Sequence, residues 1–198
     1  MPTPTESGYV MSLRSWEHLL NSHTSYLKET SPSYDEVLLE VAERIESNGS
    51  IGKADIGSLL FWKRLRADTS WVKKLMTMPE VEVRSVTEKA VSAVRDTSNT
   101  VPESASAGRK ALSPLPGFSR GDALASAVLL AAAPRRMAVY DQRAQIGLEK
   151  LALVLSPARG RYGRYMGLVE DIRGTARLNG HDWSARDVDL ALYWHGRP

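Results

Sequence analysis

The residues between positions 112 and 133 predict a tight turn followed by an apolar helix, an arrangement that directs backbone N–H groups toward an anion. Pro116-Gly117 predicts a tight turn, because proline presets a negative φ and glycine tolerates a positive one. Residues 122–133 contain no glycine or proline, and they predict an apolar helix that ends at Pro134. Backbone N–H groups at such a turn and at the start of the next helix attract phosphate, helped by the helix dipole.

Two carboxylates flank this predicted helix. Asp122 lies at its start, where we expect it to cap the helix. Asp141 follows it after a short connection, and a carboxylate in such a place can activate water or stabilise a developing positive charge. Asp141 also precedes a predicted helix that begins at Gln142, so the sequence allows an ordinary helix cap as well, and the two roles are compatible.

Two short motifs suggest a family. The run Leu115-Pro-Gly-Phe-Ser-Arg-Gly-Asp-Ala123, an aliphatic helix and then Met137-Ala-Val-Tyr-Asp141 together resemble the helix-hairpin-helix DNA glycosylases, of the 8-oxoguanine DNA glycosylase and endonuclease III type. The resemblance extends from Leu112 to about Leu148. It implies an all-α fold of two interlocked helical lobes, with the helix-hairpin-helix at about residues 103–133.

The resemblance also implies a function. It predicts a protein that binds duplex DNA through the hairpin and hydrolyses the N-glycosidic bond of a flipped, modified or damaged base. In this family the aspartate at the position of Asp141 is catalytic. Gly121 stands where members with lyase activity have a Schiff-base lysine, and Ser119 stands where the hairpin has its second glycine. We therefore expect base removal without strand cleavage.

Two other interpretations remain open. The chain can be a DNA-binding module that kept the hairpin and lost the chemistry, or an unrelated helical interaction protein whose Pro-Gly turn only imitates the motif.

The resemblance assigns further residues. The expected DNA-binding residues are those of the hairpin: Pro116, Gly117, Phe118, Ser119, Arg120 and Gly121. A K⁺ or Na⁺ ion is expected at the backbone carbonyls of Leu112, Leu115 and Gly117, and no other cofactor is required. At the base pocket we expect aromatic or cationic residues that adjoin Asp141 or lie in basic segments. They are Tyr140, Trp62, Lys63, Tyr162 and Tyr165. For Trp62 and Lys63, the sequence favours the other interpretation, a core tryptophan beside surface cations, over a place at the pocket.

Composition limits the alternatives. The chain of 198 residues has no cysteine, which excludes disulfides, thiolate-bound iron–sulfur clusters and cysteine-ligated zinc. Residues 1–108 hold 12 Lys and Arg against 15 Asp and Glu, whereas residues 109–198 hold 14 against 8. The half with the hairpin is thus the basic half, as expected for a partner with a phosphate backbone.

The remaining pattern is helical throughout. Apolar spacings predict helices near residues 9–27, 34–47, 56–66, 69–76, 79–94, 103–113, 142–151, 161–178 and 184–194, and no segment alternates as a strand does. We expect residues 1–8 to form a flexible tail and residues 9–198 a single helical domain. Without a signal-peptide pattern or a membrane-spanning run, we expect a cytoplasmic monomer, associated with the nucleoid if the protein is bacterial.

Overall fold

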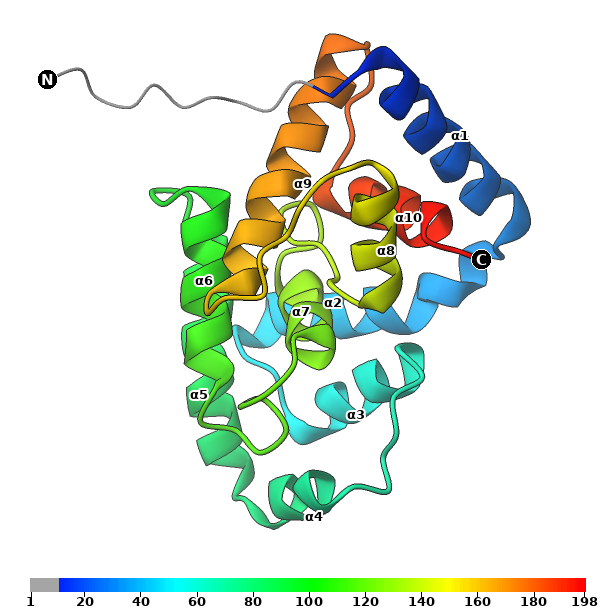
Figure 1. The fold of residues 1–198 in the computed structure, drawn as a ribbon. Coiled ribbons are helices and arrows are strands. Elements are labelled where there is room, and N and C mark those ends of the chain that lie inside the picture. The colour runs from blue at the N-terminus through cyan, green and yellow to red at the C-terminus, as the bar shows by residue number, and fades with distance from the viewer. Residues whose placement is uncertain (1–10) are drawn as a thin grey trace, which may run out of the picture.

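The computed structural model describes residues 11–198, and this part of the chain is all-helical, as predicted. The tail predicted at residues 1–8 lies outside the described residues. The elements in chain order are α1 (Leu13–Glu29), the 3-10 helix η1 (Pro32–Asp35), α2 (Glu36–Asn48), α3 (Lys53–Trp62), α4 (Ser70–Thr77), α5 (Glu80–Arg95), α6 (Val101–Leu112), α7 (Ala123–Ala132), α8 (Gln142–Lys150), α9 (Arg161–Leu178) and α10 (Ala185–His195) (Figure 1).

Helix α7 lies at the centre of the fold. Nine of its residues, from Leu124 to Ala132, are buried, which explains why this helix is apolar on every side. Helices α5 and α6 pack side by side, α6 also packs against α9, and α10 packs against α1 and α8 (Figure 1). One connected set of buried apolar side chains includes residues of all the α-helices in the described chain.

Local signals fix most helix ends near their predicted places. Helix α2 ends at Asn48 and is capped by Gly49, whose φ is +66°. Helix α10 begins after Ser184, whose hydroxyl accepts the N–H of Asp187 at 3.2 Å. Helix α3 differs from the prediction of 56–66. It begins earlier, because the Asp55 carboxylate accepts the backbone N–H of Gly52 at 3.0 Å.

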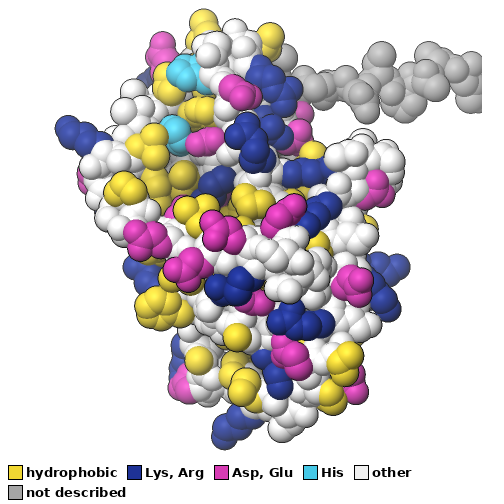
Figure 2. All heavy atoms as spheres, turned by 180° about the vertical axis from the view of Figure 1, so that it is seen from behind, with side chains coloured by type: hydrophobic (Ala, Val, Ile, Leu, Met, Phe, Trp, Pro, Cys, Tyr) yellow, Lys and Arg dark blue, Asp and Glu magenta, His cyan; other side chains and the backbone are white. Residues whose placement is uncertain are grey.

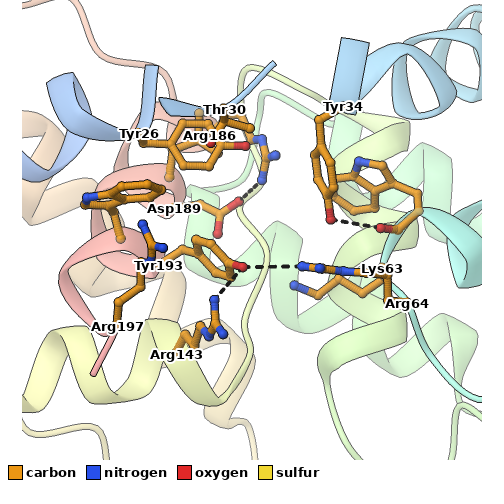
Figure 3. Close-up of a pocket in the computed structure, with 13 residues that line it drawn as sticks. Tyr26, Thr30, Tyr34, Lys63, Arg64, Arg143, Arg186, Asp189, Tyr193 and Arg197 are labelled. Carbon is orange, nitrogen blue, oxygen red and sulfur yellow. Dashed lines mark hydrogen bonds and ion pairs between the residues drawn. The ribbon is translucent and has the colours of Figure 1, made fainter. Parts of the chain in front are cut away.

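The same helix also ends earlier than predicted, at Trp62. Arg64 takes a φ of +55°, and the N–H of Leu65 reaches back to the carbonyl of Leu60 at 2.9 Å. This is the usual left-handed termination of a helix, here without a glycine. It places the side chains of Lys63 and Arg64 at the end of α3, beside α8 and α10 (Figure 3).

Candidate functional site

The connection between α6 and α7 forms the predicted turn. The N–H of Leu115 donates to the carbonyl of Leu112, and that of Phe118 donates to Leu115, each at 3.1 Å. Gly117 has a φ of +87°, as the Pro-Gly pair predicts. The indole of Trp71, from α4, lies directly against it, because a Cβ built on Gly117 would come within 2.3 Å of a ring carbon. The turn therefore needs glycine for two reasons, its backbone angle and this contact.

An arginine holds the hairpin closed from inside. Arg109 donates to the carbonyls of Phe118 at 2.7 Å and Gly121 at 2.8 Å, and to the Asp122 carboxylate at 2.8 Å. Arg161, at the start of α9, donates to the other oxygen of Asp122 at 3.1 Å. Asp122 thus makes no side-chain cap for α7, contrary to our expectation, because both of its oxygens are bound to guanidinium groups.

The residues expected to contact DNA differ in their exposure. Ser119, Arg120 and Gly121 are exposed at the tip of the connection. Pro116 and Gly117 are partly buried, and the side chain of Phe118 is fully buried in the core. Phe118 therefore anchors the turn, and only the exposed side of the hairpin can meet a phosphate. Of the carbonyls expected to bind a cation, those of Leu112 and Leu115 already accept hydrogen bonds within the turn.

Asp141 has two partners. Its Oδ1 accepts the N–H of Ala144 at 2.9 Å, which makes it the N-cap of α8. Its Oδ2 accepts from the Nζ of Lys63, which lies at the end of α3. The two side chains are only 17 % and 15 % exposed. The structure thus brings the proposed catalytic aspartate together with one of the residues expected at the base pocket.

Tyr140 links this pair to the hairpin. The guanidinium of Arg161, which binds Asp122, lies 5.0 Å from the centre of the Tyr140 ring. The Tyr140 hydroxyl donates to Gln145 at 2.7 Å, and its backbone N–H donates to the hydroxyl of Ser126, in α7, at 2.9 Å. The chain before Asp141 is therefore fixed to the helix that follows the hairpin.

Tyr162 and Tyr165 lie apart from any open space, in the core. Their side chains are almost completely buried, and their hydroxyls donate to the carbonyls of Ala138 at 2.9 Å and Val139 at 2.8 Å. Burial raises the pKa of both tyrosines, so they remain neutral. The structure places neither residue at the cavity described below. Both instead hold the segment that leads to Asp141.

A cavity of about 320 Å³ opens on the other side of Lys63. Its walls come from α1, η1, the end of α3, α8 and α10 (Figure 3). Of the residues expected at a base pocket, Trp62 and Lys63 line it. The other aromatic residues of the wall are Tyr26, Tyr34, Tyr193 and Trp194. The volume is at the lower end of the range for small-molecule sites, and aromatic walls are the surfaces on which nucleic-acid bases stack.

Cations surround the cavity. Arg143 donates to the Tyr193 hydroxyl at 2.6 Å, and Arg64 approaches the same oxygen at 3.4 Å (Figure 3). Arg197 lies 3.7 Å from the centre of the Trp194 ring. Five of the lining residues are Lys or Arg, and one is Asp. Three of these cations have carboxylate partners, Lys63 in Asp141, Arg186 in Asp35 and Asp189, and Arg197 in Glu29. The remaining two, Arg64 and Arg143, favour a ligand that offers hydrogen-bond acceptors to this wall.

Buried charges form the inner wall. Arg186 donates to both carboxylate oxygens of Asp35 at 3.0 Å and to Oδ2 of Asp189. Its guanidinium lies 5.3 Å from the centre of the Trp62 ring, and the Trp62 indole N–H donates to Asp35 at 3.0 Å. Burial raises the pKa of the Asp189 carboxyl, although Arg186 and Lys63 oppose the effect.

Sequence reasoning missed much of this wall. Asp189 looks like a helix-start residue, and Arg186, Tyr193 and Arg143 belong to no motif. The available signal is the spacing of Arg186, Asp189 and Tyr193, at intervals of three and four residues, which places them on one side of a helix. Nothing in that spacing shows that this side meets Lys63.

The back surface of the molecule carries Lys and Arg interspersed with Asp and Glu, without a single large basic patch (Figure 2). Within residues 11–198, no helix combines the length and the hydropathy needed to cross a bilayer, and no three His, Asp or Glu side chains lie close enough to hold a metal ion. Comparisons of the chain with protein-family models, with curated proteins and with solved structures find no match.

Proposed function

We propose that this protein is a monofunctional DNA glycosylase of the helix-hairpin-helix type, which acts on duplex DNA. The observation that carries the proposal is the Lys63–Asp141 pair, since Lys63 also lines the aromatic, cation-rich cavity. A base turned out of the duplex would enter this cavity, and its sugar would then lie near Asp141.

The hairpin supports the same proposal. Its exposed tip, from Ser119 to Gly121, leads into the N-terminus of α7, where backbone N–H groups favour a phosphate. Asp122, Arg161 and Tyr140 connect this end of α7 to the segment before Asp141. DNA bound at the hairpin would therefore be held at a defined position relative to the carboxylate.

The chemistry requires stabilisation of charge. As the glycosidic bond breaks, positive charge develops on the sugar and negative charge on the departing base. The Asp141 carboxylate would stabilise the sugar cation and orient the attacking water, while the cations of the cavity would stabilise the leaving base. Gly121 stands where members of the family with lyase activity carry their amine nucleophile. Water is thus the proposed nucleophile.

Base release from duplex oligonucleotides that carry a panel of modified bases, followed by mass spectrometry, tests the proposal. Asp141→Asn removes the charge and keeps the cap, because Asn and Asp cap helices about equally well. We expect the rate of base release to fall by about 10²–10³-fold, while duplex binding is retained. The thermal midpoint should also fall, because Lys63 loses its buried carboxylate partner. Asp68→Asn, an exposed carboxylate paired with Arg66, is the matched control and should have no effect.

The outcomes separate the alternatives. Duplex binding that weakens with salt, without release of any base in the panel, would identify a non-catalytic DNA-binding protein. Absence of duplex binding would remove the support for the glycosylase and for the non-catalytic DNA-binding protein alike. Equal rates for the wild type and Asp141→Asn would exclude the proposed role of the carboxylate.

A further inference from the structure

Asp189 is a buried carboxylate of which one oxygen accepts no hydrogen bond from the described residues. The residue is 2 % exposed and lies in the wall of the cavity. Its Oδ2 accepts from Arg186, whereas no donor within residues 11–198 reaches its Oδ1. Since Oδ1 has no partner and is not sealed from solvent, it borders the open space of the cavity. Figure 3 shows one carboxylate oxygen toward Arg186 and the other directed away from it.

The surrounding network holds this carboxylate in place. Arg186 is bound on its other side by both oxygens of Asp35, and it lies over the Trp62 ring. A buried acceptor without a partner costs free energy, and this one is fixed at the inner wall of a cavity with aromatic sides. The arrangement is that of a recognition group that awaits a donor from a ligand.

The charges nearby define the rest of the ligand. Lys63 and Arg64 line the same cavity, and ammonium or guanidinium groups donate to carbonyl oxygens. A ligand that fits both sides has an N–H next to a C=O. Among nucleobases this lactam group belongs to the oxo bases, such as uracil, hypoxanthine and guanine. Arg64 and Arg143 would also stabilise an oxo base as it leaves with negative charge.

We propose that Asp189 determines specificity, by accepting a hydrogen bond from the lactam N–H of an oxo base whose carbonyl faces Lys63 and Arg64. This inference rests on the proposed function only in taking a nucleobase as the ligand. It excludes bases with an amino group in place of the carbonyl, such as adenine and cytosine, as preferred substrates.

Binding of mononucleotides, measured by isothermal titration calorimetry, tests the inference without any chemistry. The probes are two pairs of 2′-deoxynucleoside 5′-monophosphates, inosine with adenosine and uridine with cytidine. We expect the oxo member of each pair to bind about ten-fold more tightly. The N1-methyl derivative of the inosine nucleotide lacks the donor and should bind about ten-fold more weakly than its parent.

Asp189→Asn should reduce both preferences to less than about three-fold. Asp35→Asn is the matched control, because Asp35 also binds Arg186 but lies outside the cavity wall. It should lower stability and keep the preferences. Equal loss of preference in the two variants would show that Asp189 only positions Arg186, which overturns the inference.

The inference is also overturned if the wild type binds both members of each pair equally, binds the methylated probe as well as its parent, or binds none at millimolar concentration. Base release is measured separately. A protein that binds oxo nucleotides but releases no base would retain this inference and lose the proposed function. Release of amino bases at the same rate as oxo bases would retain the proposed function and overturn this inference.

Discussion

Gly117 offers the sharpest test of the hairpin. In Gly117→Ala the new Cβ would come within 2.3 Å of the Trp71 ring, and the backbone would keep a φ of +87°. The left-handed backbone costs a residue with a Cβ about 1–2 kcal/mol. Overpacking against the ring adds about 1–3 kcal/mol. We therefore expect the free energy of unfolding to fall by about 2–5 kcal/mol.

Gly121 is the matched control for this substitution. Its φ is +72°, and nothing lies within 4 Å of the position of a Cβ. Gly121→Ala should therefore cost only the backbone part, about 1–2 kcal/mol. The assay is urea unfolding followed by far-ultraviolet circular dichroism.

A double-mutant cycle isolates the contact with the indole. In a Trp71→Ala background, Gly117→Ala should cost no more than Gly121→Ala, because the ring that it would overlap is absent. Equal losses for Gly117→Ala and Gly121→Ala in the wild-type background would refute the reasoning. The same result would show that Trp71 moves aside without cost.

Four further predictions concern charged groups and the nucleophile. Burial opposes ionisation of Asp187, but hydrogen bonds from His23 and Ser184 lower the pKa of its carboxyl from 3.8 to about 2. The ionised carboxylate therefore stabilises the fold fully above about pH 4, and this contribution is lost as the pH falls toward 2. Between pH 4 and pH 2 the wild type should lose about 2 kcal/mol of its free energy of unfolding through this group, measured in urea titrations, and Asp187→Asn should not show this loss. The same pH profile in the variant and the wild type would contradict the assignment. Arg109→Ala should lower the free energy of unfolding in urea by about 3–5 kcal/mol, because Asp122 loses a buried partner. Exchange of K⁺ for a bulky organic cation at constant ionic strength should leave the DNA affinity of the wild type unchanged, because the carbonyls of Leu112 and Leu115 already accept backbone hydrogen bonds. Borohydride treatment with an abasic duplex should trap no adduct, and an adduct that Lys63→Gln abolishes would show that this amine, rather than water, is the nucleophile.

The sequence predicted the helical class and most helix positions because these depend on local patterns. The turn at Pro116-Gly117 and the cap at Asp141 were also predictable, since each needs only neighbouring residues. Phe118 shows the limit of a motif: it matches the family pattern, but its side chain is buried and contributes to the core. A motif position specifies a residue type, and the packing decides which way the side chain points.

The candidate site was only partly predictable, because it is assembled from distant parts of the chain. Lys63 and Asp141 were both candidates, but nothing local to either residue shows that they form a pair. Tyr162 and Tyr165 were chosen for their basic neighbours, yet α9 has buried residues around most of its circumference, so its sequence did not show which residues face an open space. Asp189 was missed since an aspartate near a helix start has a common local explanation.

The order in which the site is assembled follows from the position of α10 in the chain. The hairpin and Asp141 precede it, whereas Arg186, Asp189, Tyr193 and Trp194 all belong to it. During synthesis, a ribosome-bound chain would therefore contain the whole hairpin before the cavity has its inner wall. If the proposed function holds, such a chain would have the parts that bind phosphate and lack those that bind a base. DNA binding would then arise before the selection of a nucleotide.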